Sequence, residues 1–305
     1  MQPRLSRGIS KVGACPTWPS SAGSVCGRKR RNMKSAMPMR SRSRKRNVNP
    51  VVFLLDVDNT LLDNDRVTAD LRRHLEHEIG GACQQQYWAI FEQLRAELGY
   101  ADYLGALQRY RIEHPHDHNL LAISSYLVNY PFADRLYPDA LDVVEQCQKW
   151  GTPVILSDGD VVFQPRKIER SGLYEAVRHN VLIYVHKERE LSEVERRYPA
   201  DHYVLVDDKL RILTAVKQAW GRRVTTVFPR QGHYATDSKI LAAFPAADIT
   251  LDRIGDLLKY DLYALVSAGR NHQGNTMPKK AQRDEDRLAE PLLVKRPGRV
   301  MRLRH

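Results

Sequence analysis

Two acidic residues, Asp56 and Asp58, stand one residue apart directly after an apolar run at 51–55. If strand geometry continues through them, both side chains point to the same side. Two like charges so close together are costly unless a cation or a shared proton intervenes. A hard divalent ion with oxygen ligands, such as Mg²⁺, meets that need. A lone Asp-x-Asp is equally typical of a loop cap, so this pair alone leaves both interpretations open.

Polar residues also directly follow two other apolar runs. Asp207-Asp208 forms a second acidic pair, which should lie beside the first if the runs are neighbouring parallel strands. Two converging acidic pairs favour a metal site over turn chemistry. Ser157, Asp158 and Gly159 end a further run, where a hydroxyl and free backbone N–H groups can hold phosphate oxygens. We therefore predict a joint metal and phosphate site.

Lys187 follows a fourth apolar run and could supply a positive charge for a phosphoryl group and for the Asp56 carboxylate. Lys167, in the stretch QPRKIERSGL, is the rival for this role. Its setting indicates an amphipathic helix with Ile168 facing inward and Lys167 facing outward, which favours Lys187. Either lysine could also be an ordinary solvated charge.

The elements that must position these residues alternate between strands and helices. Runs typical of central parallel strands occupy 51–55, 153–156, 181–185 and 203–206, with a fifth strand at 224–228. Helical patterns at 140–150 and 210–220 lie between strands. This order predicts an α/β fold with a doubly wound, Rossmann-like parallel sheet, formed by 49–63 and 136–260. The ligand site of such a sheet lies beyond the carboxyl ends of its strands.

The interval 64–135 is far longer than a crossover between two parallel strands needs. Its apolar residues recur every three or four positions, in groups that start at Leu71, Tyr87, Leu104 and Leu120. Such spacing predicts amphipathic helices that pack on one another. We therefore expect a small helical domain inserted after the first strand.

In order and spacing, four motifs resemble those of the haloacid dehalogenase superfamily. They are DVDNT at 56–60, the strand ending in Ser157, the lysine at 187 and the strand ending in Asp207-Asp208. The likeness covers about 51–250, and the inserted interval matches the position of that superfamily's helical C1-type cap. The resemblance implies a hydrolase or phosphotransfer enzyme with an aspartate nucleophile.

The resemblance also implies a role for each motif residue. Asp56 would attack phosphorus to form an aspartyl-phosphate, and Asp58 would act as general acid and then as general base. Thr60 and Ser157 would orient the phosphoryl group, while Lys187 would neutralise charge.

Magnesium binding is likewise implied for the two acidic pairs. Asp208, with Asp207 beside it, would bind Mg²⁺ together with Asp56 and the backbone carbonyl of Asp58. Many relatives carry a further acidic residue three or four positions after the second pair, whereas Lys209 and the next residues here provide none. This difference from many relatives concerns which residues would bind Mg²⁺, and not the resemblance itself.

These features predict a magnesium-dependent phosphatase acting on a small phosphorylated metabolite. Family members that act on carbon–halogen bonds lack the second aspartate, so Asp58 favours phosphoryl chemistry over dehalogenation. A mutase or other phosphotransferase with the same nucleophile is the alternative among enzymes. An inactive relative is disfavoured because every catalytic position is filled.

The formal charge of +12 comes from the two ends of the chain. Residues 1–50 hold 13 basic and no acidic residues, whereas 51–270 hold 26 basic and 32 acidic residues. The leader, 1–48, and the tail, 271–305, are predicted to be disordered and basic. An over-long translation start, an organelle transit peptide or a nucleic-acid-binding arm would each explain the leader. Nucleic acid is expected as a partner only through these ends.

No apolar run is long enough to cross a bilayer, and the leader lacks the apolar centre of a secretory signal. We therefore expect no membrane partner and predict a cytoplasmic location. The four cysteines show neither a disulfide framework nor a zinc pattern. Cys83 and Cys147 are predicted to be small buried residues.

Weaker signals lie outside the four motifs. His114, His116 and His118 alternate in EHPHDH, which could present imidazoles to a transition metal but is more typical of an exposed loop. Other residues could contact a substrate anion, although each is equally well explained as a polar loop or surface charge. They are Arg230 and His233 after the fifth strand, and Arg66, Arg109 and Arg111 in the inserted interval.

Overall fold

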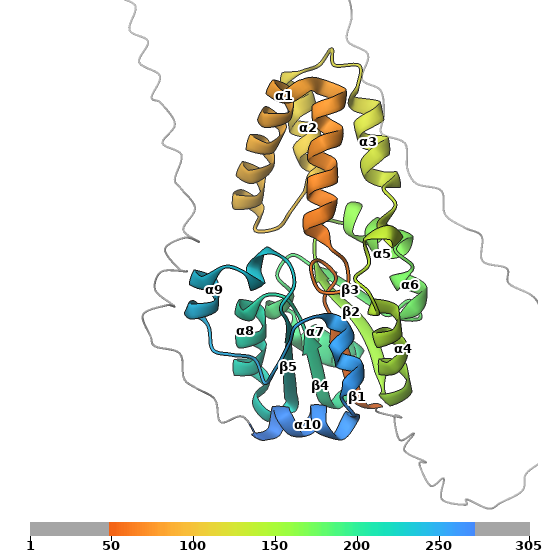
Figure 1. Ribbon diagram of the computed structural model, residues 1–305, viewed down its shortest axis with the longest axis vertical. Coiled ribbons are helices and arrows are strands. Elements are labelled where there is room, and N and C mark those ends of the chain that lie inside the picture. The colour runs from red at the N-terminus through yellow and green to blue at the C-terminus, as the bar shows by residue number, and fades with distance from the viewer. Residues whose placement is uncertain (1–48, 272–305) are drawn as a thin grey trace, which may run out of the picture. The chain divides into compact units, whose positions relative to one another are not determined.

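The computed structural model describes residues 49–271 (Figure 1). The predicted leader, 1–48, lies outside the described residues, as does the predicted tail from residue 272 onward. Within the described range, no helix has the length and apolar character that a membrane span requires.

A six-stranded parallel sheet lies at the centre of the fold, with the spatial order β3-β2-β1-β4-β5-β6. The strands are β1 (Asn49–Leu55), β2 (Thr152–Asp158), β3 (Val181–Tyr184), β4 (Ala200–Val206), β5 (Val224–Pro229) and β6 (Ile249–Leu251). The chain winds from β1 to one edge and then from β4 to the other, which confirms the predicted doubly wound fold. The sequence does not predict β6, because its three residues are too few to show a pattern.

Helices pack on both faces of this sheet (Figure 1). After the inserted segment they are α4 (Ala140–Trp150), α5 (Phe163–Arg170), α6 (Leu173–Ala176), α7 (Leu191–Arg197), α8 (Leu210–Trp220), α9 (Ser238–Ala243) and α10 (Leu262–Asn271). Phe53 and Leu55 of β1 belong to the same apolar cluster as residues of α4, and Val52 and Leu54 share a second cluster with α8. The central strand is therefore buried on both faces, as its sequence predicts.

The insert, residues 64–135 between β1 and β2, is helical as expected. It contains α1 (Asn64–Leu98), α2 (Tyr103–Glu113) and α3 (Leu120–Asn129). The first two apolar groups of the sequence both lie on α1, which bends at Gly80, where φ is 78°. Buried aromatic rings of α1 and α2 stack or meet edge to face, among them Trp88, Phe91 and Tyr103. That the insert forms a domain of its own stays a prediction.

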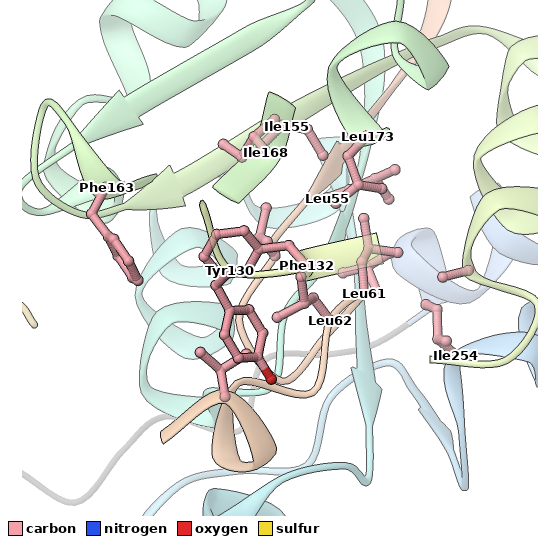
Figure 2. Close-up of a cluster of buried hydrophobic side chains, with 14 of the residues drawn as sticks. Leu55, Leu61, Leu62, Tyr130, Phe132, Ile155, Phe163, Ile168, Leu173 and Ile254 are labelled. Carbon is pink, nitrogen blue, oxygen red and sulfur yellow. The ribbon is translucent and has the colours of Figure 1, made fainter. Parts of the chain in front are cut away.

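The insert joins the sheet through an apolar cluster (Figure 2). Leu62, just before the insert, belongs to this cluster together with Tyr130 and Phe132, where the chain returns. The two crossing segments are also bonded through the backbone, because the N–H of Asp63 donates to the carbonyl of Arg135 at 2.8 Å. Packing and hydrogen bonding thus hold the base of the insert beside the end of β1.

The two cysteines of the described part have different environments. Cys147 is buried in α4, as predicted, and burial raises the pKa of its thiol to about 12. Cys83 on α1 is only half-buried, so the prediction of full burial is wrong for this residue. It lies just after the bend of α1, where the helix face is less fully covered.

Candidate active site

Three buried carboxylates meet at the carboxyl ends of β1 and β4. Asp56, Asp207 and Asp208 each offer an oxygen atom, and these atoms all lie within 4.8 Å of one another. The N–H groups of Asp56 and Asp207 extend the sheet bonding to carbonyls of β4 and β5, at 3.0 and 3.2 Å. The parallel sheet therefore brings the nucleophile candidate together with both members of the second acidic pair.

The ammonium group of Lys187 is completely buried beside these carboxylates. Its Nζ lies 2.5 Å from Asp56 Oδ1 and 2.6 Å from Asp207 Oδ2. Burial opposes its charge, but the carboxylates outweigh burial and raise the pKa of Lys187 above its ordinary value. Burial likewise works against the charge of Asp56, yet the pairing with Lys187 holds its pKa below the usual value. The lysine predicted for this role thus contacts the predicted nucleophile.

The carboxylate of Asp208 is buried without hydrogen bonds in the described part of the chain. Burial raises the pKa of Asp208 well above its ordinary value and that of Asp207 to about 6. An unpaired buried charge costs free energy. The cluster therefore fits a hard cation with oxygen ligands, such as Mg²⁺.

Asp58 is not part of this group of carboxylates. Its carboxylate pairs with Lys167, whose Nζ lies 2.5 Å from Oδ1. Lys167 is 1% exposed, so the predicted outward orientation is wrong. Helix α5 buries Ile168 in the core, but its Lys167 side meets the first turn of α1, where the ammonium donates to Asn64 Oδ1 at 2.9 Å. Each aspartate of the first pair therefore has its own buried lysine.

The three predicted phosphate-binding residues at the end of β2 have different partners. The Ser157 hydroxyl accepts a hydrogen bond from Gln164 at 2.9 Å. The Asp158 carboxylate accepts one from the backbone N–H of Lys187 at 2.7 Å, which fixes the segment carrying that lysine. The N–H of Gly159 donates to a β3 carbonyl at 3.0 Å, so it is not free, contrary to the prediction. Ser157 remains the best phosphate-binding candidate of the three.

Thr60 connects the two acidic pairs. Its hydroxyl donates to Asp56 Oδ2 at 3.2 Å and accepts a hydrogen bond from the N–H of Asp208 at 3.0 Å. The backbone carbonyl of Thr60 in turn accepts from Gln231 at 3.2 Å. The residue is fully buried, so these bonds orient the nucleophile candidate without competition from water.

The loop after β5 reaches the loop of the first acidic pair. His233 Nδ1 lies 2.7 Å from Asp65 Oδ1, and the His233 N–H donates to Asp65 Oδ2 at 2.8 Å. Gly232 has a φ of 70°, and a side chain there would collide with Asn59, so the close approach requires glycine. Arg230 is more than half exposed and does not line the site. His233 therefore lies at the site and Arg230 does not.

Two hollows lie between the insert and the carboxyl edge of the sheet, with volumes of about 330 and 90 Å³. Asp58, Arg95 and Tyr103 line both, while Lys209 and Tyr234 line the larger one. The sequence patterns do not predict that Arg95, Lys209 or Tyr234 is a site residue. Helical periodicity predicts an apolar face, but it does not say which polar residues of an insert face the sheet.

The other sequence candidates lie away from this site. His114 stacks on Tyr110 and hydrogen-bonds to Gln86 at 2.9 Å, which is a structural role. Arg109 pairs with Glu97 at 2.7 Å. The remaining candidates are exposed, namely His116, His118, Arg66 and Arg111. Within the described residues, the potential metal-ligand group contains no histidine.

Comparisons with known proteins agree with this fold. A family model described as haloacid dehalogenase-like hydrolase matches residues 51–219. A solved structure of a haloacid dehalogenase-like hydrolase from Burkholderia xenovorans LB400 is 62% identical to this chain, with a TM-score of 0.67. That match covers 70% of this chain and 99% of the other.

Two further solved structures are more distantly similar. L-2-haloacid dehalogenase from Xanthobacter autotrophicus is 17% identical with a TM-score of 0.47, over 70% of this chain and 97% of its own. A magnesium-bound hydrolase from Bacillus subtilis is 16% identical with a TM-score of 0.47, over 70% and 98%. No curated protein matches the sequence. From the family model and the 62% identical structure, we conclude that this chain belongs to the haloacid dehalogenase-like hydrolases.

Proposed function

We propose that this protein is a Mg²⁺-dependent phosphatase that hydrolyses a small phosphorylated metabolite through an aspartyl-phosphate on Asp56. The observation that carries the proposal is the arrangement of three aspartates. Asp56 is held by Lys187, Asp208 beside it is buried without a partner in the described part, and Asp58 stands apart with a lysine of its own. The site thus offers a nucleophile, a further buried carboxylate for a cation and a separate proton donor.

The carboxylates of Asp56 and Asp208 would hold Mg²⁺, together with the backbone carbonyl of Asp58. Asp207 is already engaged, because its carboxylate lies 2.6 Å from Lys187 Nζ and accepts from the N–H of Lys209 at 2.8 Å. When bound, the ion neutralises charge on the phosphoryl oxygens. The proposed magnesium dependence rests on the two buried Asp208 oxygens, which have no hydrogen-bond partner within the described residues.

Contacts to both carboxylate oxygens orient Asp56 for attack on phosphorus. Lys187 holds Oδ1 at 2.5 Å, and the Thr60 hydroxyl holds Oδ2 at 3.2 Å. In the first step, an Asp56 oxygen bonds to phosphorus while the ester P–O bond breaks. The electron pair of that bond goes to the departing oxygen, which takes a proton from Asp58. The product alcohol leaves, and Asp56 carries the phosphoryl group.

In the second step, Asp58 takes a proton from water, and the water oxygen bonds to phosphorus. The bond between Asp56 and phosphorus breaks, which releases inorganic phosphate and restores the carboxylate. Asp58 suits this shuttle because its side chain is a quarter exposed and lines both hollows. Lys167 and Gln164, at 2.5 and 3.4 Å, hold it there.

Two other reactions would use the same nucleophile. Dehalogenation is disfavoured because a departing halide needs no proton, so the general-acid role proposed for Asp58 would have no use in that reaction. A mutase or phosphotransferase stays the alternative, since only the acceptor of the second step differs. Nucleic-acid binding through the basic ends and a cytoplasmic location stay predictions from the sequence.

The proposal is tested by acid-quenched mass spectrometry of the full-length protein, together with release of phosphate and of halide from matched substrates. We expect phosphate release and transient phosphorylation of Asp56. Halide release without phosphate release would identify a dehalogenase. Appearance of the phosphate on a second organic product would identify a transferase.

A further inference from the structure

Arg95, on the last turn of α1, faces the proposed reaction centre from the insert. It lines both hollows, and so does Asp58, the proposed proton donor. Its side chain is 39% exposed, so water and a ligand can reach the guanidinium. The position on a helix of the insert places a permanent positive charge across the cavity from the carboxyl ends of the strands.

Within residues 49–271, the guanidinium of Arg95 makes one hydrogen bond and one long ion pair. Its NH2 donates to the neutral hydroxyl of Tyr234 at 2.7 Å. Glu92 lies 3.8 Å away and is itself more than half exposed, so this contact is weak. A guanidinium offers five donors, of which Tyr234 occupies one. Arg95 is therefore free to bind an anion with the remaining donors.

The other two cations that line these hollows already face carboxylates. Lys167 is paired with Asp58 at 2.5 Å. Lys209 directly follows the Asp207-Asp208 pair in the chain, and the Asp208 and Asp56 carboxylates are its main charge partners. Neither lysine is therefore free to bind an anion of the substrate. Arg95 is therefore the Lys or Arg side chain of this lining whose charge is least engaged by a carboxylate.

We infer that the substrate carries a second anionic group, a carboxylate or a further phosphate, and that Arg95 binds it. The inference rests on the proposed function, because the first anionic group is the phosphate attacked by Asp56. The larger hollow, about 330 Å³, is at the lower end of the range for small-molecule sites. Both charged ends must therefore belong to one short molecule.

Binding of non-hydrolysable phosphonates, measured by calorimetry with Mg²⁺ present, tests the inference without requiring turnover. The ligands are butylphosphonate, carboxypropylphosphonate and butane bisphosphonate, which share chain length and differ in the far group. We expect the wild type to bind one or both doubly charged ligands about tenfold to hundredfold more tightly than butylphosphonate. The stronger of the two identifies carboxylate or phosphate as the second group.

Arg95→Met should abolish this preference, and Arg111→Met is the matched control because Arg111 is an exposed arginine of the neighbouring helix α2. The control should keep the preference, and circular dichroism checks that both variants are folded. Equal binding of all three ligands by the wild type, no binding of any, or a preference that survives Arg95→Met would overturn the inference. If the preference is present but no phosphomonoester is hydrolysed, the anion site stands and the phosphatase proposal fails.

Discussion

Replacing Lys167 by methionine removes the charge that holds Asp58 while keeping most of the side-chain volume. In the native protein, Lys167 is 1% exposed and its Nζ lies 2.5 Å from Asp58 and 2.9 Å from Asn64. If Asp58 is the proton donor, Lys167→Met should slow hydrolysis most when the departing oxygen needs a proton. Alkyl phosphates should therefore suffer more than nitrophenyl phosphate, whose leaving group departs without help.

The expected size of this effect follows from the contact that is lost. A hydrogen bond to a charged group contributes roughly 1.5–3 kcal/mol, which corresponds to about tenfold to hundredfold in rate. Asp58 is a quarter exposed, so water replaces part of the contact with Lys167. We therefore expect kcat for an alkyl phosphate to fall by about tenfold relative to kcat for nitrophenyl phosphate.

The assay measures kcat and KM for both substrates in the wild type, Lys167→Met and the control Lys149→Met. Lys149 is exposed and forms a surface pair with Glu145 at 3.1 Å, so its replacement should leave the ratio of the two kcat values unchanged. A fall of the same size for both substrates in Lys167→Met would mean that the lysine only supports the fold. That result would refute the positioning role.

Three further predictions concern stability. Asp208→Asn should abolish the rise in melting temperature that Mg²⁺ gives the wild type, and an unchanged rise would remove Asp208 from the ligand set. Burial raises the pKa of Asp65, but bonds from His233 and Asn59 outweigh it and lower that pKa below 3.8. Asp65→Asn should therefore destabilise at neutral pH and progressively less as acid protonates Asp65, whereas a constant difference in urea unfolding contradicts this. Phe132→Ala, at the base of the insert, should cost about 3–5 kcal/mol of unfolding free energy; a loss under about 1 kcal/mol would contradict the packing in Figure 2.

The sheet could be predicted because central parallel strands are apolar on both faces and end abruptly in polar residues. Hydropathy nevertheless predicts the end of a strand too early. The run predicted at 153–156 extends to Asp158, because its hydrogen bonds to β3 continue past the last apolar residue. This continuation also explains why the N–H of Gly159 is not free for phosphate.

The acidic cluster could be predicted for the same reason, since parallel strands deliver their carboxyl ends to one edge. The surroundings of Lys167 could not be predicted, because helical amphipathicity does not reveal that an insert covers the polar face of α5. Arg95 was missed because its partner Tyr234 lies 139 positions further along the chain. Such contacts depend on how the insert packs against the sheet, which short-range spacing does not encode.

The central claim is that Asp56 and a divalent cation together release phosphate. Phosphate release from a broad panel of phosphorylated metabolites by the full-length protein tests it, with and without Mg²⁺ and with Asp56→Asn as control. We predict release by the wild type that requires Mg²⁺ and is lost in Asp56→Asn. Release that persists in Asp56→Asn or without the metal, or no release by folded wild type in the presence of Mg²⁺, would contradict the account.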